Sequence, residues 1–334
     1  MKLLVVAPNW IGDALLGQPL LALLRERHPG ATIDALAPAW TAPVLGRMPE
    51  IATVLPTRFE HGQLALGERW RLGRSLRGTY DAAWVLPNSL KSALVPFFAG
   101  IPKRVGFLGE QRRVLLNVVH RLDEERLPLM ADRYAQLAVP PGEPVPRPLP
   151  RTHLAIDAAN RDAALARLGL DARRPVVAFC PGAEYGPAKR WPAEHFAALA
   201  SRLSADGRQV WLFGSAKDAP VADAIVAAAP AAAMTSLCGR TDLATAIDLM
   251  SLADAVVAND SGLMHVAAAI DRPLVALYGS SSPAHTPPLQ PHARLVWLHP
   301  DCSPCFAREC PLGHFRCMRE LTPDRVAAEI AALG

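Results

Sequence analysis

Short, almost continuous apolar runs recur along this chain, and each is followed by a segment with helical periodicity. Five of them are KLLVVA at 2–7, DAAWVLP at 81–87, PVVAFC at 175–180, DAVVA at 254–258 and PLVAL at 273–277. Runs without alternating polar residues are typical of parallel strands that helices cover on both faces. The pattern therefore predicts an α/β fold built on doubly wound parallel sheets.

The same periodicities predict elements for the whole chain. We expect strands over 2–7, 32–37, 52–55, 81–86, 104–107, 175–180, 209–213, 254–258 and 273–277. We expect helices over 13–28, 63–77, 89–99, 131–138, 158–168, 193–206, 217–229, 242–252, 261–270 and 323–333. In the last of these, Thr322 suits the cap position and Pro323 suits the first turn.

A proline-rich segment, VPPGEPVPRPLPR at 139–151, interrupts this alternation. Six prolines in thirteen residues exclude a helix or a central strand, so the segment indicates a stiff linker. With 334 residues, the chain is also longer than one core usually supports. We therefore expect two Rossmann-like domains, at 1–150 and 151–334, facing a cleft.

Neither a membrane span nor a signal peptide is recognisable. No apolar run approaches the roughly 20 residues of a membrane helix, and Pro8 and Asn9 interrupt the first run. The sequence therefore predicts a cytoplasmic protein. The sequence does not indicate an oligomeric state, and we expect a monomer.

Positive charge gathers in the first half, where Lys and Arg outnumber Asp and Glu, whereas the second half is nearly balanced. The basic residues are concentrated in RWRLGRSLR at 69–77 and at Lys103, Arg104, Arg112 and Arg113. A basic surface of this kind suits an anionic partner. Nucleic acid is not expected, because aromatic residues are only 6% of the chain and no recognition module is visible.

Asp13 follows the first apolar run, in the stretch NWIGDALLGQPLLALLRERHP at 9–29. A carboxylate between a parallel strand and the next helix lies where open α/β sheets place their chemistry. Aspartate is also a favoured helix N-cap, which is the simpler interpretation of this stretch taken alone. Both roles, base and cap, stay open at this point.

Two strand-to-helix turns in the second half are polar and contain glycine. In FCPGAEYGPAKRWP at 179–192, Gly182 and Gly186 allow tight turns that leave main-chain amides free for an anion, and Lys189 adds charge. In WLFGSAKD at 211–218, Gly214 follows a strand and Asp218 opens a helix, where a carboxylate commonly binds ribose hydroxyls. Either could also be an ordinary loop.

A third turn, VVANDSGLMHVAAA at 256–269, is the most informative. After the strand, Asp260, Ser261 and Gly262 open a helix, with His265 in its first turn. Ser261 is a good N-cap, and the free amides of such a turn form a ready diphosphate site. The three turns gather at the carboxyl ends of parallel strands, which predicts a nucleotide site.

No GxGxxG fingerprint is present, which argues against an ordinary NAD enzyme. A carboxylate in one domain and a diphosphate site in the other suit a nucleotide-activated transfer. One domain would hold the leaving nucleotide, and the other would deprotonate an acceptor hydroxyl.

The stretches NWIGDALLGQPLLALLRERHP, LPNSLKSALVPFFAGIPKRVGF, PGAEYGPAKRWP, NDSGLMHVAAA and CSPCFARECPLGHFRCM are similar to glycosyltransferase family 9. They span essentially the whole chain in order. The resemblance implies the two-domain GT-B fold, which can send its C-terminal helix back to the first domain. It also implies an inverting transfer of L-glycero-D-manno-heptose from ADP-heptose to the first heptose of heptosyl-Kdo2-lipid A. This acceptor places the protein at the cytoplasmic face of the inner membrane, held loosely by charge.

The resemblance also implies roles for individual residues. Asp13 matches the catalytic base, and Lys189 matches the lysine that neutralises the departing diphosphate. Asp218 occupies the position of a ribose-binding carboxylate, where the family usually has glutamate. The expected donor-binding residues are Gly182, Ala183, Glu184, Lys189, Gly214, Asp218, Asp260, Ser261, Gly262 and His265. The expected acceptor-binding residues are Asn88, Ser89, Lys91 and Arg104.

Four cysteines, Cys302, Cys305, Cys310 and Cys317, lie close together near the C-terminus. Their number fits a structural zinc site, but apart from one CxxC pair the spacings match no standard finger. A loop of reduced thiols is the leading expectation, with zinc as its alternative. No DxD-type metal motif is present, and we expect no cofactor to be required for transfer.

Other functions stay open alongside this one. The nearest are a sibling heptosyltransferase with a different acceptor and a nucleotide-sugar epimerase, although an epimerase needs no acceptor. A protein that binds nucleotide or lipopolysaccharide without catalysis belongs to another class. It predicts tight ligand binding without turnover.

Overall fold

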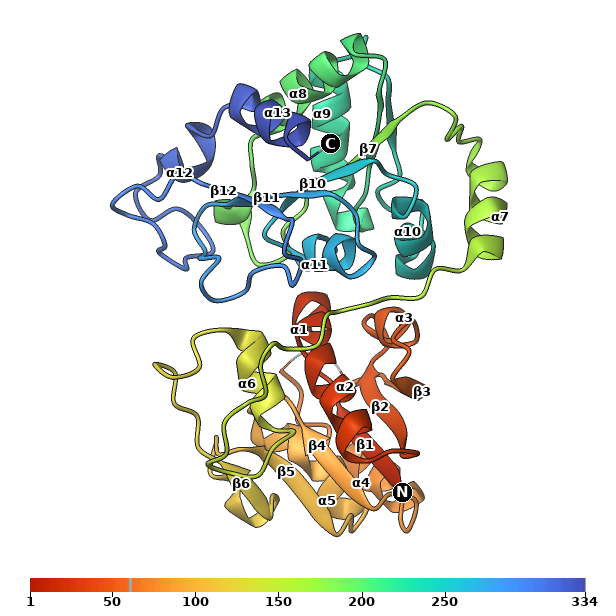
Figure 1. Cartoon of the computed structure of the whole chain (residues 1–334), viewed down its shortest axis with the longest axis vertical. Coiled ribbons are helices and arrows are strands. Elements are labelled where there is room, and N and C mark those ends of the chain that lie inside the picture. Colours follow the sequence, from red (N-terminus) through yellow and green to blue (C-terminus); the bar gives the residue numbers. More distant parts are fainter. Residues whose placement is uncertain (60–61, 334) are drawn as a thin grey trace. The chain divides into compact units, whose positions relative to one another are not determined.

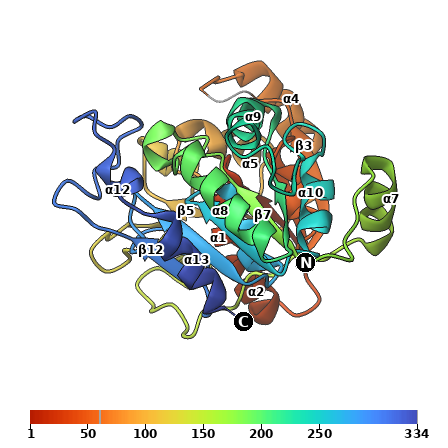
Figure 2. The same cartoon turned by 90° about the horizontal axis from the view of Figure 1, so that it is seen from above.

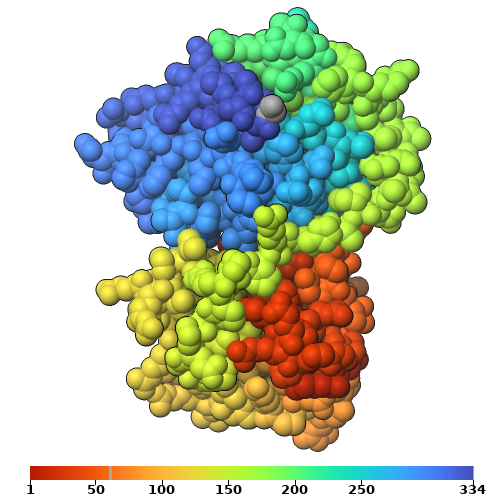
Figure 3. All heavy atoms as spheres, viewed as in Figure 1, coloured from red at the N-terminus to blue at the C-terminus, as the bar shows by residue number. Residues whose placement is uncertain are grey.

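The structure is a computed structural model that describes residues 1–59 and 62–333. The chain divides into two compact units, Met1–Leu154 and Ala155–Gly334. The division therefore falls just after the proline-rich segment, a few residues beyond the expected boundary at 150. Figure 3 shows the yellow-green residues around this segment on the surface of the first unit.

The first unit contains one sheet of six parallel strands in the order β3-β2-β1-β4-β5-β6 (Figure 1). Its strands are β1 (Lys2–Val6), β2 (Thr32–Pro38), β3 (Ile51–Thr57), β4 (Ala82–Val85), β5 (Lys103–Phe107) and β6 (Val118–His120). Its helices are α1 (Ile11–Leu16), α2 (Gln18–Arg27), α3 (Ala42–Leu45), α4 (Leu66–Ser75), η1 (Leu90–Ala93), α5 (Leu94–Phe98), η2 (Arg112–Val114) and α6 (Met130–Gln136). The central strands β1 and β4 are almost entirely buried, as their apolar runs predict.

The expected helix over 13–28 is two helices, α1 and α2, that meet at Gly17. Pro19 has no N–H to continue the helical ladder, so it is tolerated only in the first turn of a new helix. A Cβ at Gly17 would lie 2.9 Å from Leu86, so this glycine also lets the bend pack closely against the end of β4.

The second unit repeats the topology of the first, in the order β12-β11-β10-β7-β8-β9, again all parallel. Its strands are β7 (Val176–Cys180), β8 (Gln209–Leu212), β9 (Met234–Ser236), β10 (Ala255–Asn259), β11 (Leu274–Tyr278) and β12 (Arg294–Trp297). Its helices are α7 (Ala158–Leu168), η3 (Pro187–Lys189), α8 (Ala193–Ala205), η4 (Ala216–Asp218), α9 (Ala219–Ala228), α10 (Leu243–Met250), α11 (Gly262–Ala269), α12 (Arg316–Arg319) and α13 (Pro323–Ala331). Two doubly wound sheets confirm the predicted fold class.

Three strands that the apolar runs do not predict, β6, β9 and β12, lie at sheet edges. Each has only three or four residues, and most of them are partly exposed. A short edge strand is covered on fewer sides than a central one, so it carries no continuous apolar run. The sequence signal therefore marks the sheet centres and one edge strand, β3, and misses the other three edges.

The last helix, α13, is part of the second unit. Val326 and Ile330 belong to the same buried cluster as Phe196 of α8, and α13 runs beside α8 in both views (Figures 1 and 2). The expected return of this helix to the first domain is therefore wrong, because its apolar face is buried in its own unit. Among residues 1–59 and 62–333, no helix has the length and apolar character needed to cross a bilayer.

Each sheet has one topological switch point, where the strand order reverses. It lies between β1 and β4 in the first unit and between β7 and β10 in the second. Open parallel sheets bind ligands in the crevice outside the carboxyl ends of the strands at this point. The loops that follow these four strands are therefore the places to look for chemistry.

Candidate functional site

In the second unit, the loops after β7 and β10 are joined by an ion pair between Lys189 and Asp260. The Nζ of Lys189 lies 2.6 Å from Oδ2 of Asp260. The Asp260 side chain is only 4% exposed, whereas that of Lys189 is 18% exposed. The ammonium also lies 5.3 Å from the centre of the Tyr185 ring. The buried carboxylate of Asp260 therefore holds the partly exposed ammonium of Lys189 at the switch point.

His265 is buried in α11 behind this pair. Burial lowers its pKa to about 4, with Lys189 lowering it further and Asp260 opposing the shift. The imidazole is therefore neutral at pH 7, when it offers one donor and one acceptor. A neutral ring adds no repulsion against the Lys189 ammonium.

Helix α11 begins directly after Ser261, which is its N-cap residue as predicted. The Ser261 side chain makes no capping hydrogen bond, so it does not satisfy the first-turn amides that begin at Gly262. Main-chain N–H groups at a helix start have no partner one full turn earlier, although that of Met264 donates to the carbonyl of Ser261 at 3.2 Å. Such groups, together with the helix dipole, favour an anion at this position.

Asn259 was not singled out in the sequence, yet it fixes the geometry of this region. It is fully buried at the end of β10. Its Nδ2 donates to the carbonyl of Pro181 at 2.7 Å, and its Oδ1 accepts from the main-chain N–H of Trp191 at 3.1 Å. One side chain therefore ties the end of β10 to both ends of the loop that carries Lys189.

The structure brings Gly182, Gly214 and Asp218 together. A Cβ at Gly182 would lie 2.4 Å from Oδ1 of Asp218, and one at Gly214 would lie 2.8 Å from its Cβ. Asp218 forms a capping box with Ser215, whose N–H and hydroxyl donate to Oδ2 at 2.9 and 2.8 Å. Asp218 thus has a structural role that the sequence did not reveal, and its binding of ribose stays a prediction.

The other two expected donor residues also lie in the loop after β7. The carbonyl of Ala183 accepts a hydrogen bond from Arg190 at 3.3 Å. The exposed carboxylate of Glu184 pairs with Lys217 at 2.7 Å. The first contact lies within the loop after β7, and the second connects this loop to the one after β8.

In the first unit, Asp13 lies in the first turn of α1, and Trp10 occupies the N-cap position. Asp13 therefore does not cap the helix. It lines a pocket of about 240 Å³ at the β1–β4 switch point, together with Asn9, Asn88 and Tyr134. Burial raises the pKa of the Tyr134 hydroxyl well above its usual range, and the negative charge of Asp13 adds to this. Tyr134 is therefore protonated at neutral pH.

The loop after β4 carries Asn88 and Ser89, and it is held by Arg112. Arg112 is fully buried, so its expected place on a basic surface is wrong. Its guanidinium donates to the carbonyls of Pro87, Ser89 and Phe107, to the Asn88 side chain at 3.2 Å and to the Ser92 hydroxyl at 3.0 Å. Burial lowers its pKa to about 10, so it remains charged at pH 7. A buried cation thus fixes this loop.

Arg104 does not join the other expected acceptor residues. It lies near the amino end of β5, opposite Ala83 of β4, whereas Asn88 and Ser89 follow the carboxyl end of β4. Its guanidinium donates to the carbonyls of Ile101 and Leu115. The structure therefore gives Arg104 a role in joining β5 to its neighbouring loop.

The four clustered cysteines line one small pocket, together with His314 and Ser280. All four are free thiols. Within the described part of the chain, no three Cys, His, Asp or Glu side chains are arranged to hold a metal ion. Burial opposes ionisation of Cys310, but four main-chain N–H groups outweigh it and lower its pKa. This arrangement gives no support to the zinc alternative.

The chain is similar to proteins of one family in both sequence and fold. The profile of glycosyltransferase family 9 (heptosyltransferase) matches residues 69–316. Lipopolysaccharide heptosyltransferase 2 of Salmonella typhimurium is 47% identical over 342 residues, which cover 100% of this chain and 98% of that protein. Lipooligosaccharide heptosyltransferase 2 of Haemophilus influenzae is 45% identical over 310 residues, 89% of each chain. The structure of E. coli ADP-heptose LPS heptosyltransferase II matches with a TM-score of 0.90 at 46% identity, covering 100% of this chain and 98% of that one.

Proposed function

Because this chain belongs to glycosyltransferase family 9, the heptosyltransferases, we propose that it transfers L-glycero-D-manno-heptose from ADP-heptose to the first heptose of heptosyl-Kdo2-lipid A. The chain is a glycosyltransferase, and relatives that share almost half of its residues are named for heptose transfer to lipopolysaccharide. The Lys189–Asp260 pair at the β7–β10 switch point is the observation that carries the donor assignment.

ADP-heptose binds to the second unit in this proposal. An ammonium has three N–H donors, and Asp260 takes one from Lys189, which leaves two for phosphate oxygens. The amides at the start of α11, next to Ser261 and Gly262, supply further donors. Gly182, Gly214 and Asp218 contact the nucleoside side of the donor, Asp260 contacts the heptose hydroxyls, and His265 completes the donor site beside it. These groups stabilise the charge that develops on ADP as it leaves.

The acceptor binds to the first unit, where Asp13 is the base. The carboxylate accepts the proton of the acceptor hydroxyl while that oxygen bonds to the anomeric carbon and the bond from this carbon to ADP breaks. A carboxylate is a far weaker base than a sugar alkoxide, so it cannot deprotonate the hydroxyl in advance and the steps are concerted. Attack from the face opposite ADP inverts the anomeric centre.

Asn88, Ser89 and Lys91 contact the acceptor in the same proposal. Kdo and lipid A are both anionic, which fits the excess of positive charge in the first half of the chain. The protein works in the cytoplasm as a monomer, and charge attracts it to the anionic inner surface of the inner membrane.

Measurement of ADP release from ADP-heptose, with and without heptosyl-Kdo2-lipid A, tests this function. We expect the wild type to release ADP only with the acceptor. Asp13→Asn should bind ADP-heptose normally and lose almost all release. Glu26→Gln, an exposed carboxylate on α2, is the matched control and should behave as wild type.

Each other outcome would overturn one part of the proposal. Release without the acceptor would indicate hydrolysis or a different acceptor, and no release would reject the donor. Turnover retained in Asp13→Asn would remove Asp13 as the base.

A further inference from the structure

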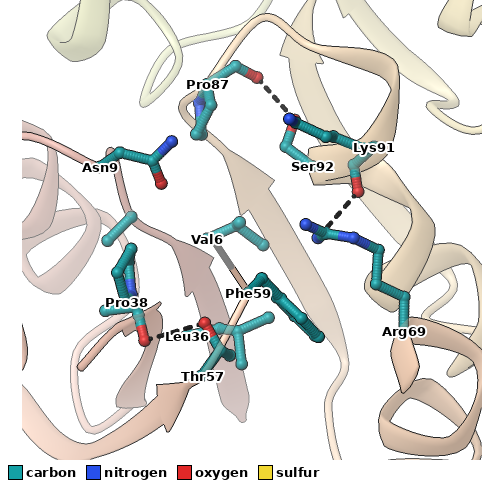
Figure 4. A pocket seen from close by; sticks show the side chains of 12 residues that line it. Val6, Asn9, Leu36, Pro38, Thr57, Phe59, Arg69, Pro87, Lys91 and Ser92 are labelled. Atoms are coloured by element: carbon teal, nitrogen blue, oxygen red, sulfur yellow. Dashed lines mark hydrogen bonds between the residues drawn. The ribbon is translucent and has the colours of Figure 1, made fainter. Parts of the chain in front are cut away.

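A second, smaller pocket lies at the carboxyl edge of the first sheet (Figure 4). Its volume is about 50 Å³, and its walls come from the ends of β1, β2 and β3 and from the loop after β4. It shares Asn9 and Pro87 with the pocket that contains Asp13. The two pockets are therefore neighbours within the same unit.

Arg69 brings a buried positive charge to this pocket. The residue is only 7% exposed. Its Nε donates to the carbonyl of Leu64 at 2.8 Å and its Nη1 to the carbonyl of Lys91 at 3.1 Å, and the guanidinium lies 4.0 Å from the centre of the Phe59 ring. Figure 4 shows the guanidinium directed toward the main chain of Lys91. Carbonyls and an aromatic face stabilise a cation, but none of them neutralises it.

Lys91 is a second cation in the wall. Within residues 1–59 and 62–333, neither Lys91 nor Arg69 forms an ion pair, and no Asp or Glu lines the pocket. Glu68 adjoins Arg69 in sequence, but it is exposed and outside the wall. Among the described residues, the pocket wall thus holds two cations and no carboxylate, so an anion that enters this pocket would be stabilised.

We infer that this pocket, named here the Arg69–Lys91 pocket, is a subsite for a carboxylate or phosphate group of the acceptor. The inference rests on the proposed function and extends it to Arg69. A planar guanidinium and a mobile ammonium together suit an oxyanion. An acceptor anchored here would reach the neighbouring pocket, where Asp13 meets its reacting hydroxyl.

Binding of small anions tests the pocket without turnover. Inorganic phosphate and acetate are titrated separately against the full chain saturated with ADP, at constant ionic strength. We expect saturable binding that weakens about tenfold in Lys91→Gln, since one charge-assisted hydrogen bond is lost. Arg71→Gln removes an exposed charge from the same helix, α4, and should bind as wild type. Equal binding in Lys91→Gln and the wild type would overturn the inference.

Acceptor kinetics identify the group that is bound. In Lys91→Gln and Arg69→Lys, KM for heptosyl-Kdo2-lipid A should rise about tenfold, with the dissociation constant of ADP-heptose unchanged. If the rise persists with acceptor lacking the lipid A phosphates, the pocket binds a sugar carboxylate, and if it disappears, the pocket binds a phosphate. An unchanged KM in both variants would refute the subsite. Anion binding without any transfer by the wild type would count against the proposed function and leave the pocket in place.

Discussion

The Nζ of Lys189 lies 2.6 Å from Oδ2 of Asp260, across the switch point of the second sheet. Lys189 comes from η3, in the loop after β7, and Asp260 follows β10. The contact therefore joins two loops separated by 71 positions in sequence. Since the carboxylate is almost fully buried, the ammonium is needed to balance its charge. The hydrogen bond to Asp260 uses only one of the three N–H groups of this ammonium.

Replacement of Lys189 by methionine should weaken the donor site and destabilise the protein together. The variant leaves Asp260 buried without its partner, and the diphosphate loses a cation. We expect the dissociation constant of ADP-heptose to rise at least tenfold, the transfer rate to fall further, and the free energy of unfolding to drop by about 3 kcal/mol. Calorimetric titration, ADP release and urea unfolding measure the three effects.

Lys217→Met is the matched control for this variant. It breaks an ion pair of 2.7 Å with Glu184, but both side chains are mostly exposed. Exposed pairs contribute at most about 1 kcal/mol, so its stability and donor affinity should stay near those of the wild type. Wild-type donor affinity in Lys189→Met would show that the diphosphate is held elsewhere.

Much of this fold was predictable because strands that are buried on both faces have continuous apolar runs in the sequence. The runs that form β1, β4, β7, β10 and β11 are apolar at nearly every position, and the structure buries them on both faces. The two doubly wound sheets confirm the fold class for the same reason, and the matching profile and relatives confirm the family. The short, half-exposed edge strands β6, β9 and β12 have no such apolar run.

Contacts distant in sequence account for what could not be predicted. Asn259 bonds to Pro181 and Trp191, which lie 78 and 68 positions away, so nothing local distinguishes it from a strand end. Arg69 and Arg112 were counted as surface charge because composition does not show that carbonyls from other loops enclose them. The roles of Asp13, Asp218 and the acceptor residues in substrate binding stay predictions.

Asn259→Ala should loosen the loop that carries Lys189. The variant leaves the carbonyl of Pro181 and the N–H of Trp191 buried without partners, which should cost about 3 kcal/mol of stability. Because the loop then moves more freely, the affinity for ADP should also fall. Ser201→Ala, which removes one hydrogen bond within α8, should change neither quantity by much. Unchanged stability in Asn259→Ala, measured by urea unfolding, would show that water replaces both bonds.

Arg112 should position the acceptor loop without touching the substrate. Arg112→Lys keeps the charge, but a single ammonium cannot reach the carbonyls of Pro87, Ser89 and Phe107 together. We expect KM for the acceptor to rise several-fold, with donor affinity unchanged and stability lowered by about 2 kcal/mol. Arg113→Lys, at the exposed neighbour, is the control and should be neutral. A loss of stability without any change in acceptor KM would restrict Arg112 to a structural role.

His265 should make the stability of the protein fall in mild acid. Burial holds its pKa near 4 in the folded protein, below the unfolded value near 6.5, and the charges that face it are those of Lys189 and Asp260. The unfolded chain therefore binds a proton first as pH falls. The free energy of unfolding is thus highest above pH 6.5 and falls progressively toward pH 4.

His265→Gln removes this titration. Urea unfolding between pH 7 and 4.5 should show the wild type losing stability faster than the variant, by on the order of 1 kcal/mol per pH unit. Parallel curves for the two proteins would mean that His265 is protonated in the folded state.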